Sequence, residues 1–265
     1  MAHPYRQSLG GALREQVNIF GAVILRDLRT RFFNHGLGFL IVPLMPVVHL
    51  FALMALHTTL GGTFAYSDSP ELFLATGLIP SLTFMYMSRM MSTSLVMNRP
   101  MLAYPIISIL DVALGRAVLE TMAAVWMAAA VVAGFYALGL DPRPHDPVQA
   151  LAAFGMSVAL AMSAGLVVSL ISMLFETFAT VWSLLMLVIY VVSGTFFVAA
   201  FLPEFALDFL VWNPVLHCVE WMRLAYYPGY PDQVLDKTYV LSVTVFLFLA
   251  GLLEERLLRR RLRSG

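Results

Sequence analysis

Four ionisable side chains stand in or beside long apolar stretches of the chain. They are Arg89, Asp111, Arg116 and Glu120. A charged side chain at mid-bilayer costs about 2.5–3.5 kcal/mol on insertion scales, so such residues are usually paired or functional. Arg116 and Glu120 are one helical turn apart and can satisfy each other. The alternative, which the sequence leaves open, is that these charges form the wall of a polar channel.

Aromatic side chains suggest a second kind of chemistry, the binding of sugars. A sugar ring stacks on a flat apolar ring while polar groups bind its hydroxyls. Belts at membrane interfaces explain most of the aromatic residues, but Tyr86, Tyr190 and Phe197 are candidates for sugar contact. The residues predicted for a translocation path are thus Tyr86, Arg89, Arg116, Glu120, Tyr190 and Phe197.

Motifs for hydrolysis, metal binding or nucleotide binding are missing. A P-loop needs a lysine after a glycine-rich turn, and the only lysine, Lys237, follows Val-Leu-Asp. His217 and Glu220 have a spacing found in some metal sites, but no third ligand is nearby. Cys218 is the only cysteine, and we expect an inert buried thiol. We predict no catalytic residue, metal or cofactor in this chain, and the zero net charge gives no attraction to nucleic acid.

The composition indicates that the helices of this chain lie in lipid. Of the 265 residues, 60% are apolar and 12% are charged, about half the charged share of a soluble domain. A spanning helix needs about 20 mostly apolar residues. The predicted fold is therefore an all-α integral membrane protein with six transmembrane helices, at Gly36–Leu60, Leu72–Met97, Leu110–Leu140, Val148–Leu174, Ala179–Ala200 and Tyr239–Leu253. Three prolines between Asp141 and Pro147 predict a sharp turn.

The arginines and the lysine set the predicted orientation. Thirteen of the 16 lie before the first span, in or near the loop after the second, or after the last. Only Arg143, Arg223 and Lys237 fall on the other side. Since cytoplasmic loops carry the excess of Lys and Arg, both termini are predicted to be cytoplasmic.

Two further segments have amphipathic patterns. Residues 13–32 place Leu13, Val17, Phe20, Ile24 and Leu28 on one stripe, which predicts an interfacial helix on the cytoplasmic surface. Asp27 and Arg31 interrupt the stripe but have the spacing of an ion pair. Residues 203–212 and 214–227 predict two short helices on the outer face, with Asn213 as an N-cap before Pro214.

The second outer helix has a polar arc. His217, Glu220, Arg223 and Tyr227 fall on one side, opposite Cys218, Val219, Met222, Ala225 and Tyr226. We expect this arc to face an exit path or a periplasmic partner, with Glu220 and Arg223 paired at the surface.

The loop after the second span has two interpretations. Residues 98–106 contain two prolines and form either a plain polar connection or a short helix that presents a surface to a soluble partner.

Three stretches together give a resemblance to a known family. They are Ile24 to Leu40, Asn98 to Glu120, and Asn213 to Tyr230. In order and position, they resemble the permease subunits of ABC-2-type exporters, most of all those that export capsular polysaccharide in Gram-negative bacteria. The resemblance covers nearly the whole chain as one domain, 1–265, with an amphipathic segment 1–35, a six-span region 36–253 and a basic cytoplasmic tail 254–265.

The resemblance implies a homodimer bound to two copies of a cytoplasmic ABC ATPase, which would bind ATP and Mg²⁺. The exported substrate would be a glycolipid-linked polysaccharide, and a periplasmic co-polymerase or adaptor would be a further partner. The implied sites are an ATPase-coupling segment at Asn98, Arg99, Pro100, Leu102 and Tyr104; a cytoplasmic gate at Arg26, Arg29, Arg31 and Phe32; and an outer gate at His217, Glu220, Arg223 and Tyr227.

Other functions compete with this one. A permease for O-antigen or teichoic-acid polymers shares the first motif. A secondary transporter often has inverted repeats, and we find none here. A transferase acting on lipid carriers would need an acid or base near the membrane surface, for which Asp111 and Glu120 are the candidates.

The predicted orientation can be tested by cysteine labelling. After replacement of Cys218, single cysteines at Ser8 and Ser264 should resist an impermeant thiol reagent in intact cells, and one at His145 should react. Labelling at Ser264 but not at His145 would reverse the topology.

Overall fold

The computed structural model describes residues 9–31, 44–60 and 69–264, and helices are the only regular elements in these ranges. The helices are α1 (Leu9–Arg31), α3 (Leu44–Thr59), α4 (Pro70–Ser92), α5 (Ser94–Met97), α6 (Arg99–Leu102), α7 (Ile109–Ala137), α8 (Pro147–Leu174), α9 (Thr177–Val191), a 3-10 turn η1 (Ala199–Phe201), α10 (Glu204–Leu210), α11 (Pro214–Tyr226) and α12 (Lys237–Ser264).

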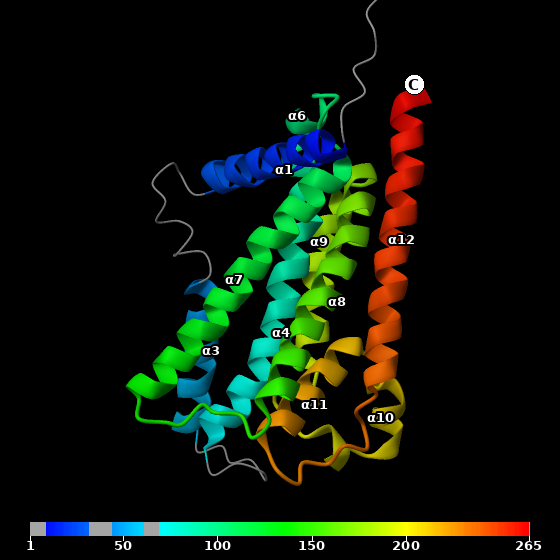
Figure 1. Cartoon of the computed structure of the whole chain (residues 1–265). Helices are drawn as coiled ribbons and strands as arrows, with labels where there is room; N and C mark the ends of the chain where they lie inside the picture. Colours follow the sequence, from blue (N-terminus) through cyan, green and yellow to red (C-terminus); the bar gives the residue numbers. More distant parts are fainter. Residues whose placement is uncertain (1–8, 32–43, 61–68, 265) are drawn as a thin grey trace, which may run out of the picture.

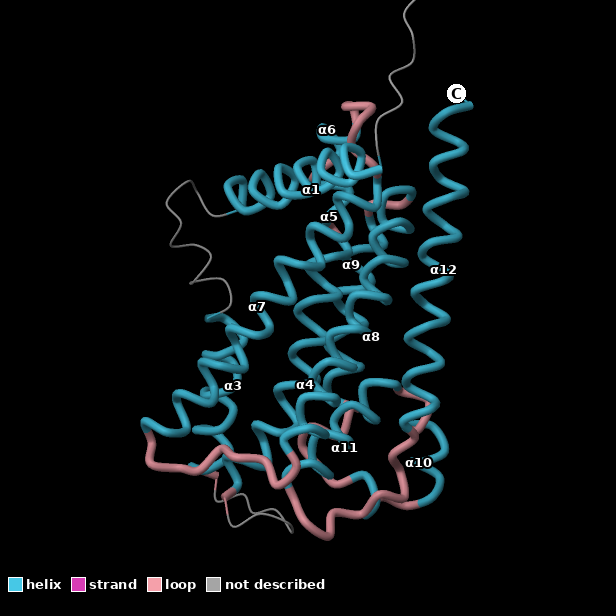
Figure 2. Tube along the Cα trace, viewed as in Figure 1, coloured by secondary structure: helices cyan, strands magenta, loops and turns pink. Residues whose placement is uncertain are grey.

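The long helices form a bundle around α4. This helix packs against α3, α7, α8, α9 and α11, and most of its side chains are buried. Figure 1 shows α1 lying across one end of the bundle, beside α6, while α10 and α11 lie at the opposite end. Figure 2 shows that the connecting loops gather at these two ends.

The turn between α7 and α8 is the element that the sequence predicted most closely. Helix α7 ends at Ala137, and Gly139 has a φ of 75°, in the left-handed region that favours glycine. Helix α8 starts at Pro147, where the Asp146 side chain accepts hydrogen bonds from the backbone N–H groups of Val148 and Gln149.

The second predicted span ends earlier than expected. Helix α4 stops at Ser92 rather than Met97, and α5 continues after a break at Thr93. The hydroxyls of Ser92, Thr93 and Ser94 each donate to a backbone carbonyl three residues before them. Such bonds compete with the helical pattern and bend helices.

The fifth predicted span is also shorter. Helix α9 ends at Val191, not at Ala200, and the chain turns at Gly194, whose φ is 76°. Phe196 and Phe197 therefore lie in a turn instead of a helix. The first span agrees with α3 in its described part, and its beginning lies outside the described residues. Helix α12 covers the sixth span and continues through the basic tail.

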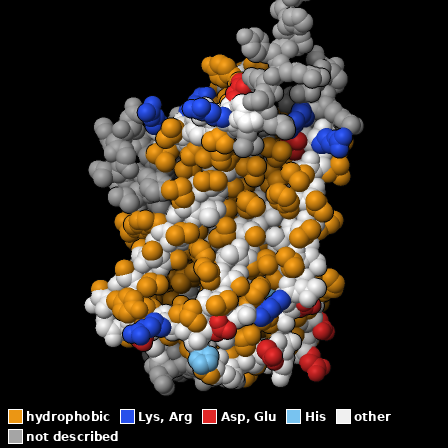
Figure 3. Space-filling view, viewed as in Figure 1, with side chains coloured by type: hydrophobic (Ala, Val, Ile, Leu, Met, Phe, Trp, Pro, Cys, Tyr) orange, Lys and Arg blue, Asp and Glu red, His pale blue; other side chains and the backbone are white. Residues whose placement is uncertain are grey.

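By length and composition, two of the described helices, α7 and α8, are apolar enough to cross a membrane, and α3 and α9 are shorter apolar helices. Many of the exposed side chains are also apolar. On α9 the exposed side chains include Val181, Leu184, Leu185, Leu187, Val188 and Val191. Figure 3 shows apolar side chains over the middle of one face, with charged side chains gathered toward its two ends.

A glycine permits the closest approach between α4 and the turn after α9. A Cβ atom on Gly77 would lie 2.9 Å from the carbonyl oxygen of Thr195 and 3.0 Å from the Arg223 guanidinium. A Cβ atom on Gly155, in the middle of α8, would meet nothing within 4 Å.

These two glycines give a matched test of the packing. Alanine is favoured over glycine in a helix by about 1 kcal/mol, so Gly155→Ala should keep or raise the thermal unfolding midpoint of the purified protein. Gly77→Ala should lower it, because overpacking costs about 1–3 kcal/mol. Equal midpoints for the two variants would contradict the close approach at Gly77.

Candidate functional site

Helix α1 is held across the bundle by a contact with α7. Gly115 of α7 has no side chain, and its Cβ position is within 3.3–3.9 Å of Val23, Ile24 and Phe20. Phe20 and Ile24 of the predicted apolar stripe thus lie against α7. Val17 of the stripe is 62% exposed, and Val23, which the stripe does not include, is buried.

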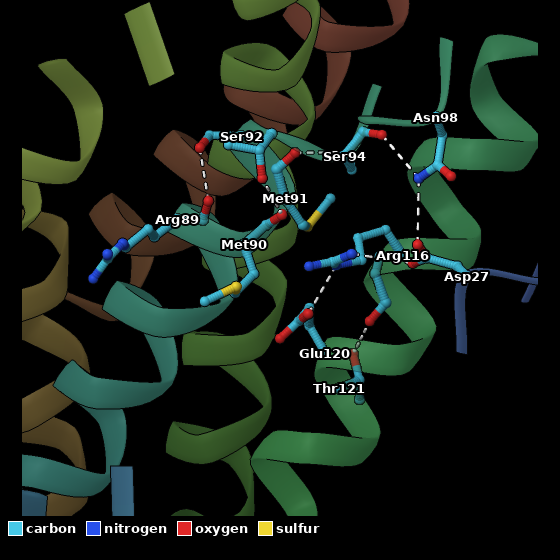
Figure 4. A network of polar contacts seen from close by, with 12 residues as sticks. Asp27, Arg89, Met90, Met91, Ser92, Ser94, Asn98, Arg116, Glu120 and Thr121 are labelled. Carbon is cyan, nitrogen blue, oxygen red and sulfur yellow. Dashed lines mark hydrogen bonds and ion pairs between the residues drawn. The ribbon is translucent and has the colours of Figure 1, made fainter. Parts of the chain in front are cut away.

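Asp27, the acid that interrupts this stripe, is at the centre of a buried polar network (Figure 4). One carboxylate oxygen accepts a hydrogen bond from the Arg116 guanidinium at 3.1 Å, and the other accepts one from the Asn98 amide at 3.3 Å. Arg116 also donates to Glu120 at 2.8 Å. These four side chains are at most 7% exposed. One carboxylate therefore connects α1, α7 and the segment between α5 and α6.

This network favours the structural interpretation of Arg116 and Glu120. Both are buried and ion-paired, so they do not face an open path. Breaking a buried pair leaves an uncompensated charge, which costs far more than an exposed pair contributes. The pairing expected between Asp27 and Arg31 is not tested, because the Arg31 side chain and Phe32 lie outside the described residues. Arg26 and Arg29 are exposed on α1.

Asp111 has a structural role at the start of α7. Its carboxylate accepts from the Ser108 backbone and hydroxyl and from Gln16 of α1, and the Ser108 hydroxyl accepts from the Asp111 backbone N–H. This reciprocal capping box stabilises the helix end. With Asp111 and Glu120 both engaged, the two candidate acids of a transferase are occupied within the fold.

The segment predicted to couple to an ATPase is held to the bundle by contacts on two sides. Asn98 is bound to Asp27, and Met101 of α6 is buried in a cluster with Val23, Leu95 and Ile109. On the other side, Arg99 donates to Glu176 at 2.7 Å and to the carbonyl of Met173 at 2.8 Å.

The outward surface of this segment is apolar. Tyr104 is 60% and Ile106 57% exposed, and Pro100 and Pro105 are exposed beside them, while Leu102 is half-buried. Figure 1 shows α6 and its loop at the end of the bundle where α1 lies. The short helix α6 and the turn after it thus present apolar side chains outward, which agrees with the second interpretation of this loop.

The residues predicted for the translocation path do not form a single cluster. Tyr86 of α4 and Tyr190 of α9 both lie near His49 of α3. Phe196 contacts Tyr190 edge-on at 5.6 Å. Phe197 instead packs near Ala199, Leu216 and Val234 beside α10 and α11. Arg89 is exposed and in Figure 4 points away from Arg116.

The predicted polar arc of α11 is not solvated. His217, Glu220, Arg223 and Tyr227 are 0–8% exposed, and the opposite side of the helix is buried as well. The expectation of a surface pair between Glu220 and Arg223 is therefore wrong. A sequence pattern separates polar from apolar sides, but it does not reveal that both sides are covered.

Arg223 holds the turn after α9. Its guanidinium donates to the carbonyl oxygens of Phe197 at 2.7 Å and Thr195 at 2.8 Å. It also lies over the Phe73 ring, 3.9 Å from the centroid, in a cation–π contact. These carbonyls belong to non-helical backbone, so Arg223 supplies the hydrogen bonds that a helix would otherwise provide.

Glu220 completes this cluster. It accepts a hydrogen bond from the Tyr230 hydroxyl at 2.9 Å and lies 3.7 Å from Arg223. Burial raises the pKa of Glu220 above its ordinary value, although Arg223 and Tyr230 act in the opposite direction.

His217 has a defined structural role as well. Nδ1 accepts from the backbone N–H of Asp236 at 3.0 Å, so Nε2 donates to the carbonyl of Val211 at 2.8 Å. This ring ties α11 to the segments on either side of it. Among the described residues, no group of three potential ligands could hold a metal ion.

A protein-family model described as ABC-2 type transporter matches residues 19–227. The chain belongs to this family. The match includes residues 19–31 of α1, the anchored α5–α6 segment and the whole of α11, so Asp27, Asn98 and Arg223 lie within the family region.

Relatives with assigned names are also similar to this ABC-2 chain. It is 26% identical over 235 residues to the polysialic acid transport protein KpsM of Escherichia coli, covering 87% of this chain and 90% of the relative. It is 25% identical over 248 residues to the capsule polysaccharide export inner-membrane protein CtrC of Neisseria meningitidis serogroup B, with 94% of each covered. The corresponding protein BexB of Haemophilus influenzae is 24% identical over 216 residues, with 82% of each covered.

The structure adds residues that the sequence did not single out as site residues. His49 joins the two tyrosines, and Phe73 and Tyr230 surround Arg223. A histidine inside an apolar stretch was the available signal for His49, since ionisable residues there are commonly functional. Nothing local predicts Phe73, because its contact depends on how α4 meets α11.

The Arg223 cluster predicts a large loss of stability on truncation. Arg223→Ala leaves two backbone carbonyls and the Glu220 carboxyl without this partner, and loss of one partner of a buried pair costs about 3–5 kcal/mol. We expect a much lower thermal unfolding midpoint in detergent. The control is Arg143→Ala, whose side chain is 75% exposed and whose loss should be neutral. An unchanged midpoint for Arg223→Ala would contradict the structural role.

Proposed function

We propose that this chain is the transmembrane subunit of an ATP-driven exporter that moves a glycolipid-linked capsular polysaccharide across the bacterial inner membrane. Family membership supports a transporter, and the names of the relatives support this substrate class. ATP and Mg²⁺ would be bound by a separate cytoplasmic ABC ATPase. Two permease chains and two ATPase chains would form the complex, with a periplasmic adaptor as a further partner.

The proposed topology uses α3, α4, α7, α8, α9 and α12 as six spans, with both termini cytoplasmic. Helix α9 has 15 residues, fewer than the about 20 that cross a bilayer. Non-helical backbone at membrane depth is tolerated where it is buried in protein and its polar groups are bound. The hydrogen bonds from Arg223 to Thr195 and Phe197 meet this condition.

The observation that carries the proposal is the anchored segment at the α1 end. It presents Tyr104 and Ile106 outward while Asn98 binds Asp27 beneath. An ATPase that moves this segment would also pull on α1 and, through Arg116, on α7. The segment would act in coupling, α1 as the cytoplasmic gate, and α10 and α11 at the outer exit.

Replacement of the outward tyrosine should test the coupling role. Tyr104→Ala removes an exposed aromatic side chain from the proposed ATPase contact without opening the core. We expect normal insertion but at least about tenfold less ATPase recovered with the purified permease, since aromatic anchors commonly dominate interfaces. Surface polysaccharide should fall in the same cells.

The matched control is Tyr136→Ala, at the opposite end of α7 from α1. That side chain is 54% exposed, similar to Tyr104, and its loss should change neither measurement. Normal ATPase recovery together with normal export in the Tyr104 variant would refute the coupling assignment.

A further inference from the structure

Three side chains meet where α4 packs against α3 and α9. The Tyr86 hydroxyl of α4 lies 3.5 Å from Nδ1 of His49 on α3. The His49 ring lies 5.7 Å from the ring of Tyr190 on α9, measured between centroids. Arg89 follows Tyr86 by three residues on α4, which places both on the same helix face.

Arg89 differs from Arg116 and Arg223, which are both buried in the bundle. Its side chain is exposed, and its guanidinium makes no hydrogen bond or ion pair within the described parts of the chain. Figure 4 shows it directed away from the Asp27 network, which would otherwise supply carboxylates. The cation is thus available to a ligand.

The three helices that carry this cluster, α3, α4 and α9, offer no acid that could neutralise Arg89. Neither α3 nor α9 contains an acidic residue. The only acid of α4 is Glu71, at the far end, where it accepts from Ser69. Glu176, just before α9, is paired with Arg99. A negative charge is the group that this face lacks.

Tyr190 provides an unsatisfied polar atom in the same place. The residue is 5% exposed, and its hydroxyl is buried without a hydrogen-bond partner among the described residues. A buried hydroxyl without a partner costs about 1–3 kcal/mol. Such a group calls for an explanation, and a ligand bound here would complete its hydrogen bonds.

We propose that His49, Tyr86, Arg89 and Tyr190 form a subsite for an acidic sugar residue of the transported polymer. The inference rests on the proposed export function and narrows its substrate to an anionic polysaccharide. Arg89 would bind the sugar's carboxylate or phosphate, the phenol rings would face the sugar ring, and the hydroxyls and imidazole would bind its hydroxyl groups.

A lipid headgroup is the competing partner for an arginine on a membrane helix. The aromatic side chains favour the sugar. A headgroup phosphate needs only the cation at the membrane surface, whereas the buried Tyr190 hydroxyl and the His49–Tyr86 pair are polar groups set among rings between three helices.

The test measures binding to the purified full-length protein in phosphatidylcholine nanodiscs. The probes are a short oligomer of sialic acid, a maltodextrin of equal length, and that maltodextrin carrying a terminal phosphate. The wild type should bind at least one acidic probe about tenfold more tightly than the neutral one, and the two acidic probes distinguish carboxylate from phosphate. Arg89→Gln should abolish the preference, and Arg89→Lys should retain part of it.

Two further variants separate binding from structure. Tyr190→Phe removes the unsatisfied hydroxyl, so a purely structural role predicts equal or higher thermal stability and unchanged binding. The subsite predicts weaker binding of the acidic probe at equal or higher stability. Arg256→Gln, an exposed arginine on α12, is the control and should keep the preference.

Several outcomes would overturn the subsite. These are equal binding of all probes by the wild type, a preference that survives Arg89→Gln, or Arg89-dependent binding that disappears when phosphatidylglycerol replaces phosphatidylcholine, which would assign Arg89 to lipid. ATPase co-purification and surface polysaccharide in a deletion strain test the export function separately. Normal results there, with no acid preference, would refute the subsite alone.

Discussion

A polar group inside an apolar bundle is costly unless it finds a partner, and this constraint determines the two ends of the molecule. At one end, Arg223 satisfies the carbonyl groups of Thr195 and Phe197 where α9 has stopped. Without these bonds, a non-helical turn would bury unpaired backbone, which lipid cannot solvate. At the other end, Asp27 holds Arg116 and Asn98. Each cluster uses one long-range side chain to join segments far apart in the sequence.

The two clusters differ in what they join. The Arg223 cluster binds turns and short helices to α4 at the centre of the bundle, the helix to which Phe73 and Gly77 belong. The Asp27 cluster joins three elements that each have exposed side chains: α1, the α5–α6 segment and the start of α7. A displacement of any one must move the others or separate buried charges. Packed and hydrogen-bonded networks with discrete arrangements can carry energetic coupling, and the Asp27 cluster is a contiguous network of buried hydrogen bonds.

Local chemistry explains which parts of the fold were predictable. Asp146 before Pro147 and Asn213 before Pro214 are strong helix starts, and α8 and α11 begin there. The early ends of α4 and α9 depend on weaker signals, three consecutive hydroxyl residues and Gly194. The environment of α11 was not predictable, because its polar residues are satisfied by Tyr230 and by carbonyls distant in sequence. Periodicity reports the two sides of a helix but not what covers them.

The sequence does not predict which arginines find a buried partner in the folded chain. Arg89 and Arg116 both interrupt apolar stretches. Hydropathy therefore assigns both the same free-energy cost of insertion and marks both as candidate functional residues. In the folded chain, Arg116 is 4% exposed between two carboxylates, whereas Arg89 is exposed on a face without acids. The first charge is accounted for by folding, because its partners already neutralise it. The second has no partner among the described residues, and the proposed subsite would supply one.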